Sequence, residues 1–543
     1  MTPESPGYSE KQQSELNEIK ESYDQIPYQS FPYPKSSPAH LRTIGKLFGM
    51  NPPSLETARI LELGCAAGGN LIPIAVQFPQ ATFTGVDLSE KHVNAGQEFI
   101  NQIGLTNIEL KLCSITEIDE SFGQFDYIIA HGVFSWVPDF VREKIFSVCQ
   151  QLLSTSGIAY ISYNTLPGWN TRRIIRDMAI FHGQHFEQTD KKIEQTKELL
   201  NFISQALEGA DDSYAKLIME SVNLLKGKQD YYIAHDFLEI NNKPFYFSEF
   251  IQMASSYELK YLSEASVPSM YLGNYSNAIS TTLGQINDII KAEQYLDFIT
   301  NRHFRSTLLC HKEQDDVIER TLAKESLYGS FLKISVVPNK PLNRVNLGDP
   351  TEESKFEMNS GQTYVLTTSS PILKAVFYTF SEFYNIYIGY EELVVRAAEK
   401  LTDVTEQMVM DEVDGTLVTL YLSGRMDIRS DAVPVNHQPS DKPKVWSYAA
   451  AQCSYLPVSY VTNLYHEPVA ISIFEKFMIP LLDGTRTKQD VLAQMMQHVM
   501  KNDFDVNFEG KKVESEERII NILSLAYIDG IEKFTKSGLL VNP

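Results

Sequence analysis

The 543-residue chain has few cysteines and little positive charge. Its five cysteines are scattered without a C-x-x-C pair, so the sequence indicates neither a zinc site nor a disulfide framework. No apolar run approaches the roughly 20 residues that span a bilayer, and the polar N-terminal stretch lacks a signal-peptide core. We therefore expect no metal, no membrane insertion and a cytoplasmic location.

Acidic residues outnumber basic ones and give the chain a formal net charge of −22. Binding to a phosphate backbone needs a basic surface, so this charge argues against nucleic acid as a partner. It suits a cationic partner better. Solubility alone explains the charge at least as well, because net charge governs association and not fold.

The most informative segment is a strand-like run at 59–63, followed by a glycine-rich turn at 64–69 and an amphipathic stretch at 71–78. Glycines have no Cβ atom, so a ligand can lie against the backbone, and the next helix offers unpaired N–H groups. A second apolar run, 81–86, ends at Asp87, about 20 residues after the first glycine, where a carboxylate can accept both ribose hydroxyls. Together these segments predict a nucleoside site.

The spacing of the turn indicates which nucleoside binds. A dinucleotide site would read G-x-G-x-x-G, but this chain reads Glu62-x-Gly64-x-Ala66-x-Gly68. That pattern resembles the E/D-x-G-x-G-x-G signature of class I S-adenosylmethionine (SAM) methyltransferases, with Ala66 in place of the central glycine. Glu62 suits SAM, which has no phosphates and carries a sulfonium and an ammonium that favour acceptors. Without Asp87, an ordinary strand-turn-helix would be an equally good interpretation.

Three more segments follow in the order expected for such a core. Residues 110–115 resemble a third strand whose end usually holds adenine through Asp or Asn, whereas this chain has Ser114 and the backbone of Ile115 there. Residues 123–134 resemble the fourth strand and its loop, and 152–163 a helix end and fifth strand. This alternation predicts an α/β fold with a mostly parallel sheet, a class I (Rossmann-like) methyltransferase core. The residues expected to bind the cofactor are Tyr23, Tyr28, Glu62, Gly64, Cys65, Ala66, Gly68, Asn70, Asp87, Leu88, Ser114, Ile115, His131 and Gly132.

Beyond the fifth strand, the sequence departs from a simple core. A chain of this length is expected to form three or four domains. A long helical region after Tyr163 indicates an insertion, and we expect the sheet to finish near 304–309. The predicted parts are an N-terminal lid or packing arm (1–45), the SAM-binding core (46–170), a helical insertion (171–230), a middle domain (231–315), a winged-helix-like module (316–430), a linker (431–444) and a C-terminal winged-helix-like domain (445–543).

The last third of the chain repeats one pattern, helices followed by a short hairpin, which suggests two winged-helix-like α+β modules. Such modules often bind DNA. The overall acidity and the absence of a helix rich in Lys and Arg make protein recognition or scaffold packing the better interpretation.

The chain resembles a family of bacterial protein-lysine methyltransferases with a methyltransferase regulatory domain, whose studied members modify a large outer-membrane surface protein. The resemblance implies a SAM-bound core, a dimerising helical segment, a middle domain and a C-terminal domain that helps to hold a protein substrate. We therefore expect a surface or outer-membrane protein as substrate, and a homodimer. The segments that carry the resemblance are 23–28, 61–70, Asp87, 131–138, 163–169, 235–239 and 302–305.

Methyl transfer is an in-line displacement that needs an acceptor lone pair and the exclusion of water. A lysine acceptor, with a pKa near 10.4 in solution, needs a site that favours the neutral amine, such as an aromatic channel. Tyr163 and Asn164 could align the amine, and His131 is interpreted as a cofactor contact rather than a base. Phe134, Trp136, Tyr163 and Trp169 are candidates for the channel walls, with Tyr23 and Tyr28 closing it; Phe134, Trp136, Tyr163 and Asn164 form the predicted catalytic set.

Three functions remain open from the sequence. A protein-lysine methyltransferase is favoured by the resemblance and by accessory domains of about 300 residues, which a small acceptor would not need. A small-molecule or natural-product methyltransferase comes second, because the fold does not fix the acceptor. A non-catalytic SAM-binding interaction protein is third, suggested by Ala66 and Ser114.

Overall fold

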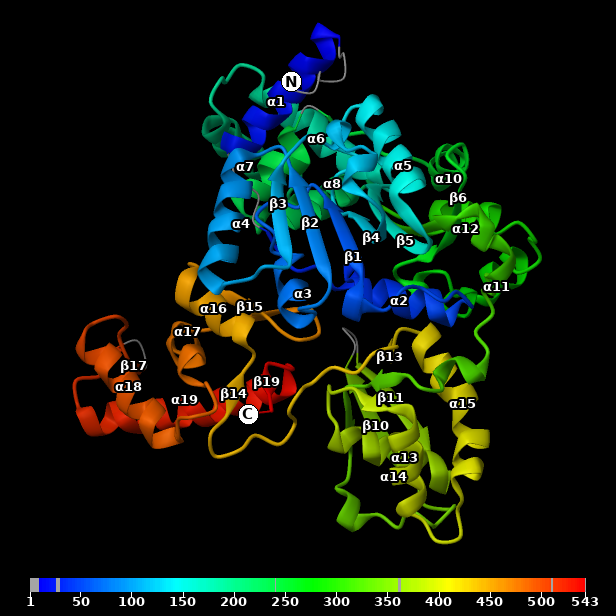
Figure 1. Cartoon of the computed structure of the whole chain (residues 1–543), viewed down its shortest axis with the longest axis vertical. Helices are drawn as coiled ribbons and strands as arrows, with labels where there is room; N and C mark the ends of the chain where they lie inside the picture. The colour runs from blue at the N-terminus through cyan, green and yellow to red at the C-terminus, as the bar shows by residue number, and fades with distance from the viewer. Residues whose placement is uncertain (1–8, 26–29, 240, 360–362, 509–510, 543) are drawn as a thin grey trace. The chain divides into compact units, whose positions relative to one another are not determined.

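The computed structural model describes residues 9–25, 30–239, 241–359, 363–508 and 511–542 (Figure 1). The chain forms two compact units, one from Met1–Phe31 with Phe48–Ile318 and one from Pro32–Leu47 with Glu319–Pro543. The predicted lid segment, 1–45, is therefore divided between them. Helix α1, Glu10–Gln25, belongs to the first unit and α2, Pro38–Leu47, to the second.

A seven-stranded sheet in the order β3-β2-β1-β4-β5-β7-β6 forms the centre of the first unit. Strands β1 to β5 pair in parallel, while β7 runs antiparallel to both β5 and β6. The order reverses between β1 and β4, and ligands of open α/β sheets bind at such a switch point, beyond the carboxyl ends of the strands. The predicted fold class is confirmed. The strands are β1 Arg59–Leu63, β2 Thr82–Asp87, β3 Ile108–Leu112, β4 Phe125–Ala130, β5 Leu153–Asn164, β6 Leu259–Glu264 and β7 Phe304–His311.

Helices cover both faces of this sheet. Because crossovers between parallel strands are right-handed, the reversal of strand order places α3 (Ile72–Gln77) and α4 (Glu90–Ile103) on one face and α5 (Asp139–Leu152) on the other. Helix α5 shares one buried core with α10, Phe247–Ser255, and with apolar residues of β1, β4 and β5. This core packs against the face of the sheet that α5 covers.

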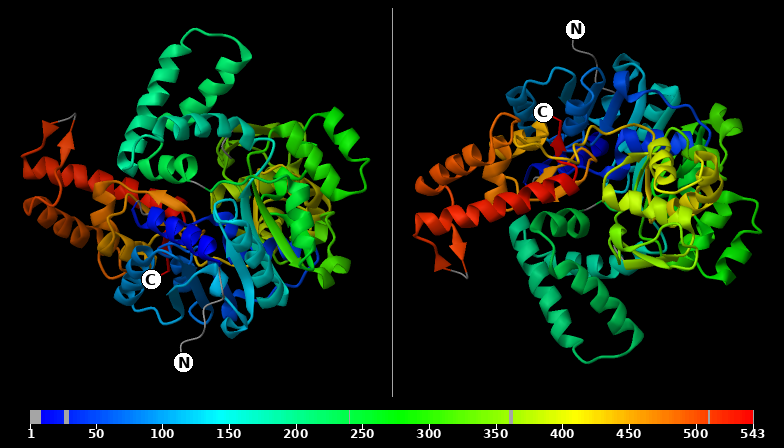
Figure 2. Two further views of the ribbon diagram at one scale, coloured as in Figure 1. Left: turned by 90° about the horizontal axis from the view of Figure 1, so that it is seen from above. Right: turned by 90° about the horizontal axis from the view of Figure 1, so that it is seen from below.

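Helices α6 (Trp169–Gly183), α7 (Thr189–Ala206) and α8 (Ser213–Lys226) interrupt the core between β5 and β6. They pack around a small apolar cluster of their own, and Figure 2 shows them as an arm that extends away from the sheet. The chain then returns through α9 (Asp230–Ile233), α10, β6, α11 (Asn277–Leu283) and α12 (Ile289–Thr300) to β7. The prediction that the sheet is completed near 304–309 is confirmed, since β7 lies between β5 and β6.

In the part of the chain that the structure describes, the first module of the second unit combines three α-helices with the three-stranded sheet β12-β8-β13. A second sheet, β11-β10-β9, extends it. The elements are β8 Phe331–Lys333, β9 Val336–Pro338, β10 Ser354–Asn359, β11 Thr363–Thr368, α13 Pro371–Glu382, β12 Ile388–Gly389, α14 Tyr390–Glu399, α15 Glu406–Leu422 and β13 Asp427–Arg429.

Among its described residues, the second module contains four α-helices and three strand pairs. The predicted linker is held against it, because Val435 forms a bridge with Val541 and the Asn436 N–H donates to the Leu540 carbonyl. No helix among the described residues combines the length and the hydropathy that crossing a membrane requires. The elements are α16 Ser447–Tyr455, α17 Ile473–Met478, α18 Lys488–Met500, α19 Glu516–Lys536 and the pairs β14 Lys444–Val445 with β19 Leu540–Val541, β15 Tyr460–Thr462 with β16 Pro468–Ala470, and β17 Asn507–Phe508 with β18 Lys511–Lys512.

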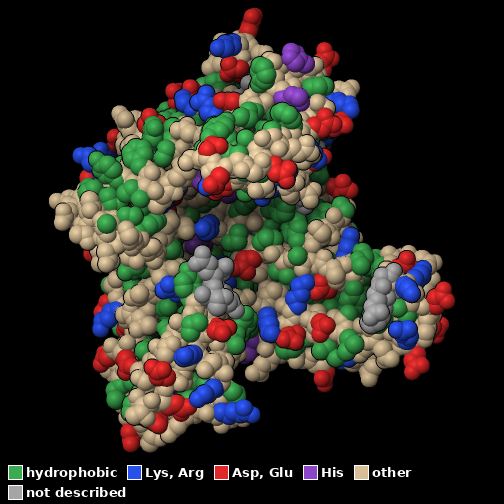
Figure 3. Space-filling view, turned by 180° about the vertical axis from the view of Figure 1, so that it is seen from behind, with side chains coloured by type: hydrophobic (Ala, Val, Ile, Leu, Met, Phe, Trp, Pro, Cys, Tyr) green, Lys and Arg blue, Asp and Glu red, His purple; other side chains and the backbone are tan. Residues whose placement is uncertain are grey.

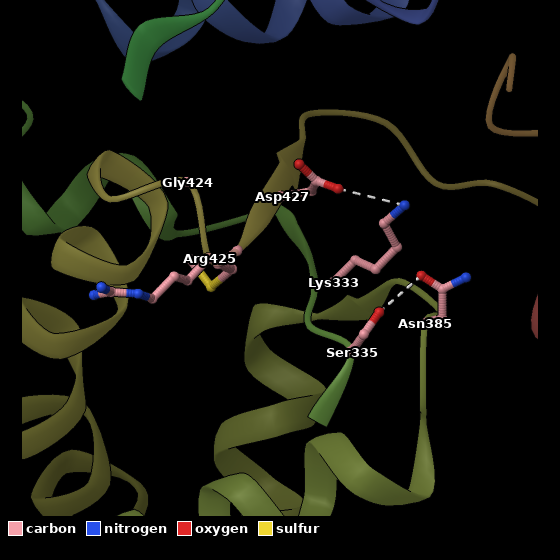
Figure 4. Close-up of a pocket in the computed structure, with 7 residues that line it drawn as sticks. Lys333, Ser335, Asn385, Gly424, Arg425 and Asp427 are labelled. Carbon is pink, nitrogen blue, oxygen red and sulfur yellow. Dashed lines mark hydrogen bonds and ion pairs between the residues drawn. The ribbon is translucent and has the colours of Figure 1, made fainter. Parts of the chain in front are cut away.

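A buried lysine joins the two modules. Lys333 Nζ lies 3.4 Å from Asp427 Oδ2 and 3.2 Å from Glu467 Oε1, and stands over the rings of Tyr387 and Tyr465. Figure 4 shows Lys333 facing Asp427 at the edge of a cavity of about 160 Å³. The carboxylates and aromatic rings compensate the burial of this cation, so it serves as a structural link.

Candidate active site

The glycine loop follows β1 and bends sharply at Gly64, which has φ +73°. A Cβ atom here would lie 2.5 Å from Val133 Cγ2, so only glycine fits without a shift. The N–H groups of Gly64 and Cys65 both donate to the carbonyl of Val86, at 2.8 and 3.0 Å. These bonds hold the loop against the end of β2.

Ala66 occupies the place of the signature's central glycine and has φ 47°. Left-handed backbone of this kind is uncommon outside glycine. The loop thus keeps the conformation that the signature implies, with a methyl group in place of a hydrogen.

Asp87 ends β2 beside this loop. Its Oδ2 accepts the Ala66 N–H at 2.8 Å, and its Oδ1 accepts the Ser89 N–H at 2.9 Å. The side chain is 14% exposed, so a fixed carboxylate with acceptor capacity to spare faces the loop. This is the arrangement that two ribose hydroxyls require.

Glu62 is a buried carboxyl with one oxygen unpaired. Oε1 accepts from Asn70 Nδ2 at 2.7 Å, whereas Oε2 has no hydrogen-bond partner among the described residues. Burial raises the pKa of Glu62 to about 8, although the hydrogen bond from Asn70 acts to lower this pKa. A cation beside Oε2 would compensate the burial of the Glu62 carboxylate, and the ammonium of SAM is such a cation. Neighbouring Cys65 is also buried, which raises its thiol pKa well above the ordinary value and makes it unreactive.

The end of β3 provides fewer free groups than expected. Ser114 Oγ accepts the Thr116 N–H at 3.3 Å and shares a 2.6 Å hydrogen bond with the Thr116 hydroxyl. Ser114 thus caps the short helix that begins at Ile115. The side chain of Ile115 belongs to the hydrophobic core, and that of Leu88 packs against this core while partly buried. An adenine contact by Ser114 would share an oxygen that already has these partners.

At the end of β4, His131 belongs to a polar group that sequence reasoning did not identify. Its Nδ1 lies 2.8 Å from the hydroxyl of Tyr160, which donates to Ser306 Oγ at 3.0 Å. The N–H of Gly132 donates to Ser162 Oγ at 2.8 Å. Burial lowers the pKa of His131 to about 4, so the imidazole is neutral near pH 7. Alternation along β5 puts Tyr160 and Ser162 on one face, a signal that only a known strand register could have revealed.

Two predicted channel residues lie in the hydrophobic core instead. Phe134 is fully buried among Phe146, Phe245 and Phe250, with ring centroids 5.2–5.3 Å apart. Tyr163 stacks on Phe250 at 4.0 Å, and its hydroxyl lies 3.2 Å from Thr307 Oγ1. From the sequence, both rings are predicted to be walls of an open channel. Tyr163 faces α10 because side chains on β5 alternate, and Phe134, in the turn after β4, packs against the same aromatic residues of 245–250.

The other predicted acceptor residues do come together. The Asn164 N–H donates to Ser135 Oγ at 2.9 Å, which joins the end of β5 to the loop after β4. Trp136, half-buried, meets Trp169 edge to face at 6.2 Å, and Trp169 is 3% exposed. Trp136 is therefore the better exposed of the two indoles.

Part of the N-terminal segment lies over the glycine loop. The N–H of Gly69 donates to Ser30 Oγ at 2.8 Å, and a Cβ at Gly69 would lie 2.7 Å from the Ser30 carbonyl oxygen. Ser30 is not among the predicted cofactor contacts, although it belongs to the segment that is predicted to act as a lid. Tyr28 and the side chain of Tyr23 lie outside the described residues.

A second group of buried charges lies where β6, β7 and α12 meet. Arg305, on β7, contacts Glu264 on β6 at 2.7 Å and Glu293 and Asp297 on α12 at 2.9 and 2.8 Å. Arg302 adds a 3.0 Å contact to Asp297. The planar guanidinium of Arg305 also lies 3.8 Å from the centroid of the Phe247 ring. We call Arg302, Arg305 and these three carboxylates the arginine cluster.

Comparison with known proteins agrees with this geometry. Family models match at residues 55–236 (methyltransferase domain), 229–311 (predicted methyltransferase regulatory domain) and 441–539 (PKMT, C-terminal winged helix domain). An uncharacterized protein of Rickettsia prowazekii is 43% identical over 96% of this chain and 93% of its own. The structure of PKMT2 from Rickettsia typhi is 34% identical, covers 95% of this chain and 100% of its own, and has a TM-score of 0.87. The same protein in complex with AdoHcy gives a TM-score of 0.88.

Proposed function

The chain belongs to the family of bacterial protein-lysine methyltransferases with a methyltransferase regulatory domain, and we propose that it methylates lysine side chains of a protein substrate with SAM as donor. When bound, SAM would supply its sulfonium methyl group: a neutral amine attacks the methyl carbon in line, the C–S bond breaks to release the thioether, and the methylated ammonium then loses a proton. The related PKMT2 binds AdoHcy, the thioether product of this reaction.

The observation that carries the proposal is the pair of acids beside the glycine loop. Glu62 offers a buried, unpaired Oε2 that suits an ammonium, and Asp87 offers a fixed carboxylate that suits two hydroxyls. Both groups occur in SAM, and neither acid suits a phosphate. Of the other predicted contacts, Gly64, Cys65, Ala66, Gly68 and Asn70 form or support the loop, while Leu88, Ser114, Ile115, His131 and Gly132 lie at the ends of β2, β3 and β4.

For the acceptor, we assign Trp136 and Asn164 the direct roles. Trp136 would shield the lysine amine from water and so favour its neutral form, while the carbonyl of the Asn164 amide could accept from the amine. Phe134 and Tyr163 support these residues from the core. A histidine with a pKa of about 4 is too weak a base to hold a lysine proton, so His131 serves as an acceptor and the proton leaves through water.

The remaining parts of the chain are assigned supporting roles. We propose that 1–45 contains a lid, which the contact between Ser30 and Gly69 supports, over a core at 46–170. The middle domain, 231–315, completes the sheet with β6 and β7. The modules at 316–430 and 445–543, joined at 431–444, are proposed to recognise the substrate protein.

We propose that the helical insertion, 171–230, forms a homodimer. It exposes large apolar side chains, among them Phe181 (73% exposed), Phe202 (65%) and Tyr214 (52%). Exposed aromatic groups of this size favour a protein contact.

We also propose a surface or outer-membrane protein as the substrate and a cytoplasmic location for the reaction. All five cysteines are free thiols, as in a reducing compartment. Nucleic acid is not proposed as a partner, because Lys and Arg are interspersed with Asp and Glu on the face in Figure 3 rather than gathered into a basic patch.

The test is incubation of the purified protein with methyl-labelled SAM and a bacterial extract, followed by separation of proteins from metabolites. We expect label in protein bands, with methylation on lysine by peptide mass spectrometry. The Asp87→Ala variant should give none. Label confined to small molecules would favour a natural-product methyltransferase, and no label with retained SAM binding would favour a non-catalytic role.

A further inference from the structure

His92 is a buried histidine that the proposed function leaves without a role. Its side chain is 5% exposed, and neither Nδ1 nor Nε2 has a hydrogen-bond partner among the described residues. An unpaired buried polar group is costly, and native proteins contain few of them. A hydrogen bond that forms only when a ligand binds would explain the imidazole.

The local chain path directs His92 back toward Asp87. Oδ1 of Asp87 accepts the Ser89 N–H, and Ser89 Oγ accepts the His92 N–H at 3.3 Å as the N-cap of α4. With these two hydrogen bonds in place, His92 Nδ1 lies 3.9 Å from Oδ1 of Asp87. The separation is too long for a hydrogen bond, and a shift of about 1 Å would close it.

We propose that His92 is a positioning residue for the ribose-binding carboxylate, with its Nδ1–H donating to Asp87 Oδ1 in the SAM complex. This inference rests on the proposed SAM-binding function. Ala66 and Ser89 each hold one oxygen of Asp87, and the imidazole adds a third donor on the side of α4. Three donors fix the rotation of the carboxylate, and Oδ2, which accepts only the Ala66 N–H, keeps a lone pair for the ribose.

Isosteric variants test which ring nitrogen matters. His92→Leu removes both nitrogens, His92→Asn keeps a donor near the place of Nδ1, and His92→Gln keeps one near Nε2. SAM affinity is measured by calorimetry, and the melting temperature is measured without ligand. His235→Leu is the matched control, since His235 is equally buried and its Nδ1 lies 3.4 Å from Glu239 Oε1.

We expect His92→Leu to raise the Kd for SAM by about tenfold or more, as loss of a hydrogen bond to a charged group would, with an unchanged or higher melting temperature. His92→Asn should stay within about threefold of wild type, and His92→Gln should resemble His92→Leu. The control should leave the Kd unchanged and lower the melting temperature.

Two results would overturn the inference. Unchanged affinity in His92→Leu would mean that the imidazole is only buried, and equal losses in all three variants would mean that it acts without Nδ1. Failure of the wild-type protein to bind SAM would instead refute the proposed function, so the two failures are distinguishable.

Discussion

Two groups of buried carboxylates lie in the first unit, and they differ in how completely their oxygens are paired. In the arginine cluster, Arg305 reaches all three acids, and further hydrogen bonds join Glu264 to Thr307 and to the N–H of Ser306. At the glycine loop, one oxygen of Glu62 has no partner among the described residues. The paired group connects β6, β7 and α12, whereas the unpaired one lies where a ligand is expected.

The contrast shows how stability and function can be separated by the pairing of charges. A buried acid that the protein neutralises by itself holds elements together, and its loss is felt in folding. A buried acid that the protein leaves incomplete makes the unliganded state less stable and the liganded state more stable. Mutations in the two groups should therefore affect different measurements.

The largest expected effect is on folding, at Arg305. Arg305→Met leaves Glu264, Glu293 and Asp297 buried without their main cation, so the free energy of unfolding should fall by about 3–5 kcal/mol in urea titrations. Arg396→Met, which breaks an exposed pair with Glu392, should cost less than about 0.5 kcal/mol. Equal stability of the two variants would remove the distinction between the groups.

The next effect is on binding, at Asp87. Asp87→Asn weakens two hydrogen bonds to the ribose, each worth about 1.5–3 kcal/mol, so the Kd for SAM should rise by roughly 100-fold while the protein stays folded. Asp119→Asn is a matched control, because Asp119 also accepts a backbone N–H two residues ahead, from Ser121, but is exposed. Retained binding in Asp87→Asn, measured by calorimetry, would count against the ribose assignment.

The smallest effect concerns the backbone of the loop. Ala66→Gly should raise the free energy of unfolding by about 0.5–1 kcal/mol, because it relieves a left-handed alanine, and should leave the Kd for SAM within about twofold. Ala75→Gly, in the ordinary helix α3, should lower stability by about 1 kcal/mol. Changes of the same sign in both variants would show that Ala66 is not strained.

Much of the fold could be predicted from the sequence because its signals are local. The apolar run before Gly64, the turn and Asp87 lie within about 30 residues of chain, and their order is typical of parallel strands. The completion of the sheet near 304–309 could be inferred from the same alternation after the helical insertion.

The site was less predictable because its remaining features depend on contacts between distant segments. Phe134 and Tyr163 are core residues only because Phe245 and Phe250 pack over them. Arg305 finds Glu264 on another strand, and Ser30 meets the loop from a segment 39 residues earlier. Composition and spacing do not encode such pairings.

The central claim is that the unpaired carboxyl of Glu62 receives the ammonium of SAM. The raised pKa means that Glu62 is mostly protonated at pH 6 to 7 in the unliganded protein, and that its contribution to stability is present at low pH and lost as the pH rises toward 8. Binding of a cation should draw off that proton. The α-amino group of SAM stays largely protonated over this range, since such groups have a pKa near 7.7–8.0.

Calorimetric titration with SAM at pH 6 and pH 7, on wild type and Glu62→Gln, tests the claim most directly. With a pKa of about 8, the wild-type affinity should rise by about ninefold between the two pH values, as the ionised fraction of Glu62 does, and the rise should be absent in Glu62→Gln. A flat wild-type affinity, or an equal rise in both proteins, would contradict the account.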